Sequence, residues 1–122
     1  MRKDCELAKK SEIKLNDLMK LPLIVSRQGM TEDYPKWFSE KVDTLNITAT
    51  FNLIYNAAVM VREGMGYALS FDHLVDTGAD SDLCFRPLIP KLNTEIYVIW
   101  KKYQVFTPIA SMLLEILKQE FE

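Results

Sequence analysis

Short apolar runs of strand length alternate with helical patterns along most of the chain. The continuous apolar run at residues 21–26 is typical of a strand that is buried on both faces of a sheet. β-Branched residues are frequent at 46–51, and further runs of strand length lie at 66–71, 83–88 and 95–100. We expect strands at these five places.

Helical patterns follow several of these strands. A loop at 27–29 is expected to lead into a helix that starts at Tyr34, with Pro35 in its first turn. A second helix is predicted over 52–64, with Asn52 or Thr50 as its cap and Gly64 just past its end. A terminal helix is predicted, with Thr107 as its cap and Pro108 as its first residue. Its apolar stripe consists of Ile109, Met112, Leu113, Ile116, Leu117 and Phe121.

The order of these elements predicts an α/β fold. Strand, helix, strand, helix and strand form a βαβαβ unit, and right-handed crossovers wind such a unit into a parallel sheet with helices on both faces. A length of 122 residues favours one compact unit. The composition, 48% hydrophobic and 26% charged, excludes the disordered and membrane-embedded classes.

Charge and cysteine usage narrow the function further. The net charge is -2, and neither half of the chain is a basic arm, so we do not expect this segment to contact DNA. No apolar stretch approaches the roughly 18 residues that span a bilayer. The first residues are basic, as in a signal peptide, but no apolar run follows them, which favours a cytoplasmic protein. Cys5 and Cys84 lack metal-ligand spacing, and we interpret both as ordinary reduced thiols, with Cys84 buried on a strand.

Signals for catalysis, a metal or a cofactor are weak. His73 is the only histidine and is interpreted as a surface residue. Glu32 and Asp33 lie in a presumed loop without an apolar pocket that would raise a carboxyl pKa. The acidic loop does not have the spacing of a calcium-binding loop and is interpreted as a solvated turn; its carboxylates are Asp76, Asp80 and Asp82. We therefore expect no catalytic site, no metal and no cofactor.

A ligand site is predicted from position alone. In an open parallel sheet, ligands bind beyond the carboxyl ends of the strands. Here these ends carry Ser26-Arg27, the segment 48–52 and Ser70-Phe71, which together offer hydroxyls, one guanidinium, one aromatic face and the free amides of a helix start. Such groups suit a small anion with an apolar body. The alternative is that Thr50 and Asn52 only cap a helix, and that the two serines only satisfy local backbone groups.

Several motifs in this order resemble the effector-binding domain of LysR-type transcriptional regulators. The resemblance rests on 13–18 followed by 21–24, on a helix that opens at Asn52-Leu53 and closes in 61–69, on the run 83–88, and on 96–102 before a final helix. It implies a periplasmic-binding-protein-like (type 2) fold with an effector cleft at the hinge between two subdomains. Residues 1–19 would be a lead-in or hinge segment, 20–89 the second effector-binding subdomain, and 90–122 the return strand and C-terminal helix of the first.

The resemblance also implies a function. The protein would bind a small-molecule effector and transmit this to a winged helix-turn-helix domain that lies outside this sequence, so the 122-residue piece would not bind DNA by itself. Cleft positions carried over from the family are Ser26, Arg27, Thr48, Thr50, Phe51 and Ser70. Many members carry an apolar residue followed by proline where this chain has Ser70-Phe71, which leaves the effector's identity open.

Other classes of protein remain as alternatives. A solute-binding protein lobe would share the fold but should bring an export signal, and a small flavodoxin-like enzyme should show a phosphate-cradling loop after the first strand. A third alternative is an oligomerisation module. Members of the resembled family usually pair through their effector domains, and an uncovered apolar stripe on the terminal helix favours self-association, so we expect a homo-oligomer rather than a clean monomer.

Overall fold

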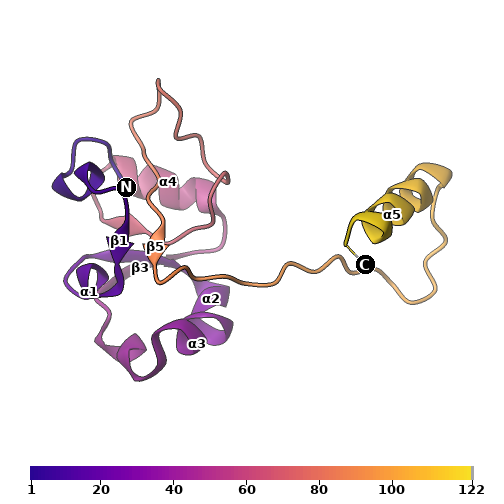
Figure 1. Ribbon diagram of the computed structural model, residues 1–122, viewed down its shortest axis with the longest axis horizontal. Coiled ribbons are helices and arrows are strands. Elements are labelled where there is room, and N and C mark those ends of the chain that lie inside the picture. Colours follow the sequence, from indigo (N-terminus) through magenta and orange to yellow (C-terminus); the bar gives the residue numbers. More distant parts are fainter. Residues whose placement is uncertain (122) are drawn as a thin grey trace.

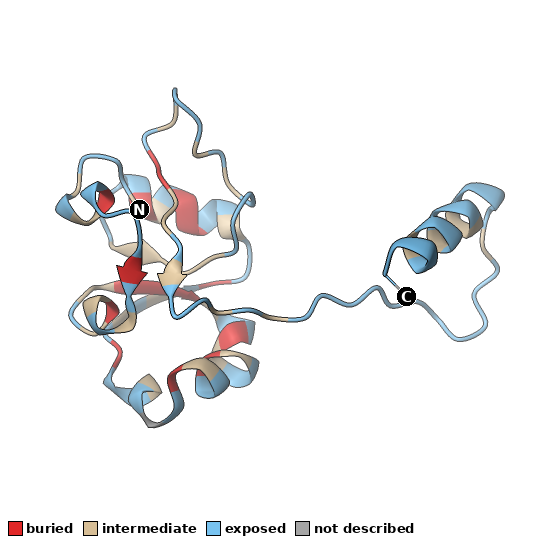
Figure 2. Cartoon of the chain, in the orientation of Figure 1, coloured by how far each residue is buried: buried red, intermediate tan, exposed pale blue. Residues whose placement is uncertain are grey.

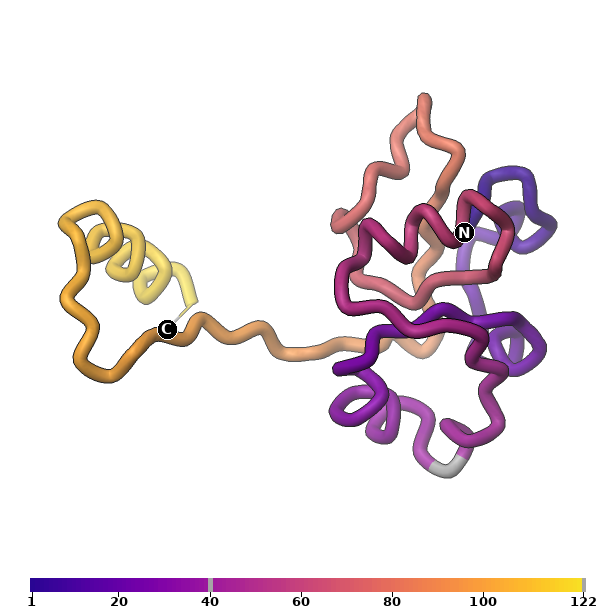
Figure 3. The backbone as a smooth tube through the Cα atoms, turned by 180° about the vertical axis from the view of Figure 1, so that it is seen from behind, coloured from indigo at the N-terminus to yellow at the C-terminus, as the bar shows by residue number. Residues whose placement is uncertain are grey.

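The computed structural model describes residues 1–121, except for the side chain of Glu40. Residues 1–89 form a packed body, and the chain then runs through an extended arm to a terminal helix that stands apart from that body (Figure 1). The view from behind shows the same separation (Figure 3). Almost all red, buried segments lie in the body (Figure 2).

A three-stranded parallel sheet lies at the centre of the body. Its strands are β2 (Leu23–Ser26), β3 (Ile47–Phe51) and β4 (Tyr67–Ala68), in the spatial order β3-β2-β4. Leu23, Ile24 and Val25 of the central strand are fully buried, as the continuous apolar run predicted. The strand predicted at 66–71 is shorter than expected, although the Leu69 N–H extends the pairing by donating to the Ile24 carbonyl at 3.0 Å.

Helices cover both faces of this sheet. One face carries α2 (Arg27–Glu32), α3 (Tyr34–Phe38) and the 3₁₀ helix η2 (Ser39–Thr44), and there Tyr34 and Phe38 pack against Leu23 and Val25. The other face carries α4 (Ile54–Arg62), whose Ala57, Ala58 and Val61 pack against Ile24 and Phe51. The predicted α/β fold with a parallel sheet and helices on both faces is confirmed.

A second, two-stranded parallel sheet joins distant parts of the chain. It pairs β1 (Ile13–Lys14) with β5 (Leu88–Ile89), and short helices flank β1, namely η1 (Glu6–Lys9) and α1 (Leu15–Leu18). The prediction of a strand over 83–88 is wrong. Among these residues, Leu83 forms an antiparallel bridge with Arg2, Leu88 pairs with Ile13 in the parallel sheet, and the four between them belong to no strand. Arg86 instead donates to the carbonyls of Ala8 and Lys10, and Pro87 has no N–H for a ladder.

The loop predicted at 27–29 is also wrong, because α2 starts directly after β2. The Ser26 hydroxyl accepts a hydrogen bond from the Gly29 N–H at 3.3 Å and so caps the helix. Gly29 lies against the ring of Tyr34, where a Cβ atom would come within 2.8 Å of Cζ. The Tyr34 hydroxyl in turn accepts a hydrogen bond from the Ser26 N–H at 3.2 Å.

The caps predicted for α4 are wrong, whereas its end is as expected. The helix begins after Leu53, and neither Asn52 nor Thr50 forms a side-chain cap. Gly64 follows the helix at φ 78°, the left-handed conformation that glycine adopts at lowest cost.

The strand predicted at 95–100 is absent, and its residues form part of the exposed arm. Ile96 and Ile99 are 87% and 88% exposed, and no other strand pairs with this segment within residues 1–121. A β-strand requires a neighbouring strand to pair with, and without one the exposed N–H and C=O groups of this segment are left to water. The terminal helix α5 (Pro108–Phe121) is confirmed, with the Thr107 hydroxyl accepting from the Ala110 N–H at 3.3 Å.

Gly66 makes the approach of β4 to β2 possible, and we expect Gly66→Ala to destabilise the body. A Cβ atom there would come within 2.3 Å of the Pro22 carbonyl oxygen, which itself accepts from the Tyr67 N–H. The expected loss in the free energy of unfolding is about 2 kcal/mol or more. Urea unfolding measures it, with Gly64→Ala as control. Nothing lies near a Cβ at Gly64, so only the positive φ costs energy there, about 1 kcal/mol. Equal losses would contradict the close approach.

Tyr34 fixes the junction between β2 and α2, and we expect Tyr34→Phe to leave the Ser26 N–H without its acceptor. The expected cost at neutral pH is about 1–3 kcal/mol in urea unfolding. Burial raises the pKa of the Tyr34 hydroxyl, so the neutral ring's contribution is complete below about pH 10 and is lost as the pH rises through the folded pKa. The variant should therefore lose less stability than the wild type above pH 10. Tyr55→Phe removes a hydroxyl from an exposed ring and should change neither the free energy of unfolding at neutral pH nor its loss above pH 10.

Candidate functional site

The strand register brings several of the predicted site residues to one edge of the sheet. Ser26 is the register partner of Phe51, and Ile24 pairs with Ala68, which places Ser70 level with Ser26 on the other side. Neighbouring strands lie about 4.8 Å apart, and residues in register point to the same face. Ser26, Phe51 and Ser70 therefore lie across the carboxyl edge, on the face that α4 covers.

Arg27 is the free charge at this edge. Its side chain is exposed and forms no ion pair with any side chain that the structure describes. Ser26 beside it is half-buried, and its hydroxyl oxygen, although it caps α2, keeps its own proton for donation. Both residues are held in place because the Ser26 N–H is bonded to the buried Tyr34. The edge thus presents one cation and one hydroxyl on a fixed backbone.

The β3 residues occupy three different environments. Thr48 lies three residues before the end of the strand, about 10 Å from the edge, and donates to the Leu23 carbonyl at 3.1 Å. Thr50 is exposed and pairs with Val25, so it points to the face covered by α2 and α3. Phe51 is buried and packs in the core beside Ile24. The structure therefore does not bring Thr48 and Thr50 together with the two serines.

The start of α4 adds the free backbone amides that were expected from the sequence at this edge. Leu53 precedes the helix without a side-chain cap, so N–H groups of the first turn have no side-chain acceptor. The positive end of the helix dipole lies there as well. Because α4 follows β3 within three residues, these donors lie at the same edge as Phe51. These N–H groups have no side-chain partner because neither Asn52 nor Thr50 caps the helix.

Ser70 also borders a small, partly open hollow between α4 and the segment after β4. Its hydroxyl donates to the Phe71 carbonyl at 3.1 Å. Asp72 accepts from the backbone N–H of His73 at 2.8 Å, and the His73 ring is 94% exposed, as expected for a surface residue. Side chains lining the hollow include Ala58, Val61, Ser70, Phe71, Val75, Leu83 and Phe85.

The far side of this hollow comes from the start of the chain, which sequence reasoning passed over. Residues 1–3 run antiparallel to 82–84, with the Cys84 N–H donating to the Met1 carbonyl at 2.8 Å. Burial lowers the pKa of the Met1 amino group, which donates to the Cys84 carbonyl at 3.1 Å. No local pattern at residues 1–12 signalled this pairing. It depends on contacts between residues about 80 positions apart.

Nothing in the described residues forms a metal centre. No group of three or more His, Cys, Asp or Glu side chains is placed to hold a metal ion within residues 1–121. The acidic loop is a local turn, as predicted, since Asp76 Oδ1 accepts from the Gly78 N–H at 2.9 Å. Cys84 is buried as expected but lies beside the Arg2–Leu83 bridge rather than within a strand.

Comparison with known proteins identifies the family. No helix in residues 1–121 is long and apolar enough to cross a membrane. Searches of curated proteins and of solved structures gave no match. The family model described as the LysR substrate binding domain matches residues 1–122, the whole sequence. The resemblance seen in the sequence is thereby confirmed, and the chain belongs to the LysR substrate binding domain family, the effector-binding domains of LysR-type transcriptional regulators.

Proposed function

We propose that this chain is the ligand-sensing part of a LysR-type transcriptional regulator and that it binds a small organic anion at the carboxyl edge of the three-stranded sheet. The observation that carries the proposal is the convergence of hydrogen-bond donors there, with the Arg27 guanidinium free of any ion pair to a described side chain. Arg27, Ser26, Ser70 and the open first turn of α4 all lie at this edge. Family membership supports a regulatory role rather than an enzymatic one.

An anion is the class of ligand that these groups favour. Charge-assisted hydrogen bonds from a guanidinium are about twice as strong as neutral ones, and helix N–H groups aim partial positive charge at the same place. Asp72, the nearest carboxylate in the hollow, already accepts from its own neighbour. Phe71 is partly exposed and offers an apolar face to the body of the ligand. That Thr48, Thr50 and Phe51 contact the effector stays a prediction.

Signal transmission follows from differential affinity. An effector that binds one arrangement of two subdomains more tightly shifts the population towards that arrangement, and linked DNA-binding domains then change their relative placement. In this proposal residues 20–89 form the second subdomain, and 90–122 belong to the first. The exposed arm and the absence of buried residues in α5 support that division, because such surfaces require a partner. The regulator would act on DNA in the cytoplasm.

Arg27→Gln tests the anion site. A thermal-shift screen of small carboxylates should find ligands that raise the melting temperature of the wild type, and the variant should bind the same ligand about tenfold or more weakly. Lys36→Gln removes an exposed cation from α3 and should bind like the wild type. Equal affinity in the wild type and Arg27→Gln would contradict the role of Arg27.

A second pair of variants decides which face the ligand occupies. Ser70→Ala should weaken binding because Ser70 lies level with Ser26 on the α4 face, whereas Thr50→Ala should leave it unchanged if the ligand contacts only that face. Loss of binding in Thr50→Ala would extend the site to both faces and restore Thr50 as a contact.

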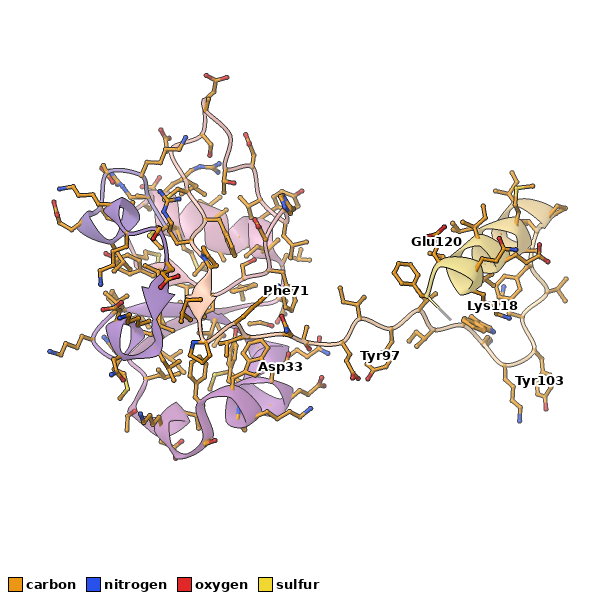
Figure 4. All side chains as sticks on the ribbon, viewed as in Figure 1. Asp33, Phe71, Tyr97, Tyr103, Lys118 and Glu120 are labelled. Carbon is orange, nitrogen blue, oxygen red and sulfur yellow. The ribbon has the colours of Figure 1, made fainter. Side chains whose placement is uncertain are left out.

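The uncovered surface of the C-terminal arm leads to a prediction of self-association. Ile109, Met112, Leu113 and Ile116 are exposed on α5, and the aromatic rings of Tyr97 and Tyr103 project from the arm (Figure 4). We expect the 122-residue chain to sediment as a dimer or larger species at micromolar concentration. Leu113→Gln should shift it towards a monomer, while Lys118→Gln on the opposite side of the helix should not. A single 14.1 kDa species in the wild type would contradict the proposal.

A further inference from the structure

The two cysteines, which are far apart in the sequence, meet at one carbonyl group. The Cys5 thiol donates to the Arg2 carbonyl oxygen at 3.1 Å, and the Cys84 thiol points to the same oxygen at 3.9 Å. Two sulfur atoms at these distances from one oxygen are at most 7.0 Å apart, which is the sum of the two distances. Rotation about the two Cα–Cβ bonds changes the separation of such sulfurs by several ångströms.

Backbone pairing brings the two thiols together. Lys3 N–H donates to the Asp82 carbonyl and Cys84 N–H to the Met1 carbonyl, both at 2.8 Å, on either side of the Arg2–Leu83 bridge. Cys5 follows at once, as the residue that precedes η1, and its own carbonyl accepts from the Ala8 N–H. The convergence is therefore built by four backbone groups and a helix start rather than by a chance contact of side chains.

The environments of the two thiols are unequal. Cys5 is half-buried and can be reached from solvent, whereas Cys84 is 6% exposed and lies behind it. Tyr67 lies beside Cys5. Burial raises the pKa of the Tyr67 hydroxyl, and the neighbouring Cys5 thiol raises it to a lesser extent. An accessible thiol next to a sheltered one is the arrangement in which an oxidant attacks the first and the second resolves the product.

We propose that Cys5 and Cys84 are an oxidant-responsive thiol pair that forms an intramolecular disulfide. A peroxide oxidises the Cys5 thiolate to a sulfenic acid as its O–O bond breaks, and the first oxygen leaves as water. The Cys84 sulfur then attacks the sulfenic sulfur, the S–O bond breaks, and the second oxygen leaves as water with the thiol proton. Two thiols lose two electrons in total and one peroxide gains them. A dithiol reductant reverses the step.

The disulfide would tie together the two segments that lead into the β1–β5 sheet. Cys5 lies eight residues before Ile13 of β1, and Cys84 lies four residues before Leu88 of β5. The link would close a long loop that includes the central sheet and would hold residues 1–5 against 82–84 in addition to their hydrogen bonds. Neither cysteine is among the residues proposed to bind the anion, although Cys84 lines the same hollow as Ser70, so disulfide formation and anion binding are measured separately.

Oxidation of the reduced wild-type chain by hydrogen peroxide tests the pair. Free thiols should fall from two per chain to none, and tryptic mapping should show the peptide 4–9 joined to the peptide 63–91, with the loss of two hydrogens, because trypsin does not cleave the Arg86–Pro87 bond. The oxidised protein should remain a single chain on a non-reducing gel, melt at a higher temperature than the reduced form, and return to two thiols with dithiothreitol. Retention of both thiols, or links between chains only, would overturn the proposal.

Single variants assign the order of events. In Cys84→Ala the Cys5 sulfenic acid has no resolving thiol and should be trapped by dimedone, whereas the wild type should give no adduct. In Cys5→Ser the sheltered Cys84 should react with peroxide several times more slowly than Cys5 does in Cys84→Ala. Dimedone trapping in the wild type at the same level as in Cys84→Ala would show that Cys84 does not resolve the intermediate. Mapping of the wild-type disulfide decides the matter even where a variant fails to fold.

Discussion

The burial of β2 between two parallel neighbours is the constraint on which the rest of the structure depends. Three consecutive apolar side chains are removed from water there, each contributing about 2 kcal/mol. Alternation along the strand sends Leu23 and Val25 to one core and Ile24 to the other. One short strand thereby holds α3 on one face and α4 on the other. A shift of its register by one residue would exchange the two cores.

The same register determines what the carboxyl edge can bind. Ser26 ends β2, and its N–H reaches Tyr34 while its hydroxyl caps α2, so Arg27 leaves the sheet in a fixed direction. The partners of β2 then set which side chains lie beside it. Phe51 and Ser70 share the α4 face, and Thr50 faces the opposite core. Position at a strand end is therefore not sufficient for a shared site, because residues one apart in register serve opposite faces.

Sequence patterns predicted the parts of the fold that local chemistry decides. The buried strand at 23–26, the β-branched strand at 47–51, Pro35 in the first turn of α3, Gly64 after α4 and the Thr107 cap of α5 all depend on neighbours within a few residues. The loop expected at 27–29 and the caps expected for α4 failed locally, and the other failures arose where partners are distant. Arg86 and Pro87 depend on contacts with residues 8–13, and 95–100 has strand composition but no strand to pair with. The site residues could be placed at strand ends from the sequence, but their division between faces required the register.

The N-terminal segment shows how much a region of weak local pattern can contribute once its partner is known. Met1 lines the hollow beside Ser70, and the pairing of residues 1–3 with 82–84 also brings Cys5 close to Cys84. Met1 lines this hollow together with Ser70, while Cys84 lines it from the other strand of the pair. A covalent link at this pair would restrict motion of residues 1–3 relative to 82–84, and Met1, Leu83 and Cys84 of these segments line the hollow that Ser70 borders. If the thiols form the proposed disulfide, their redox state would be physically connected to the shape of the hollow through one short antiparallel contact.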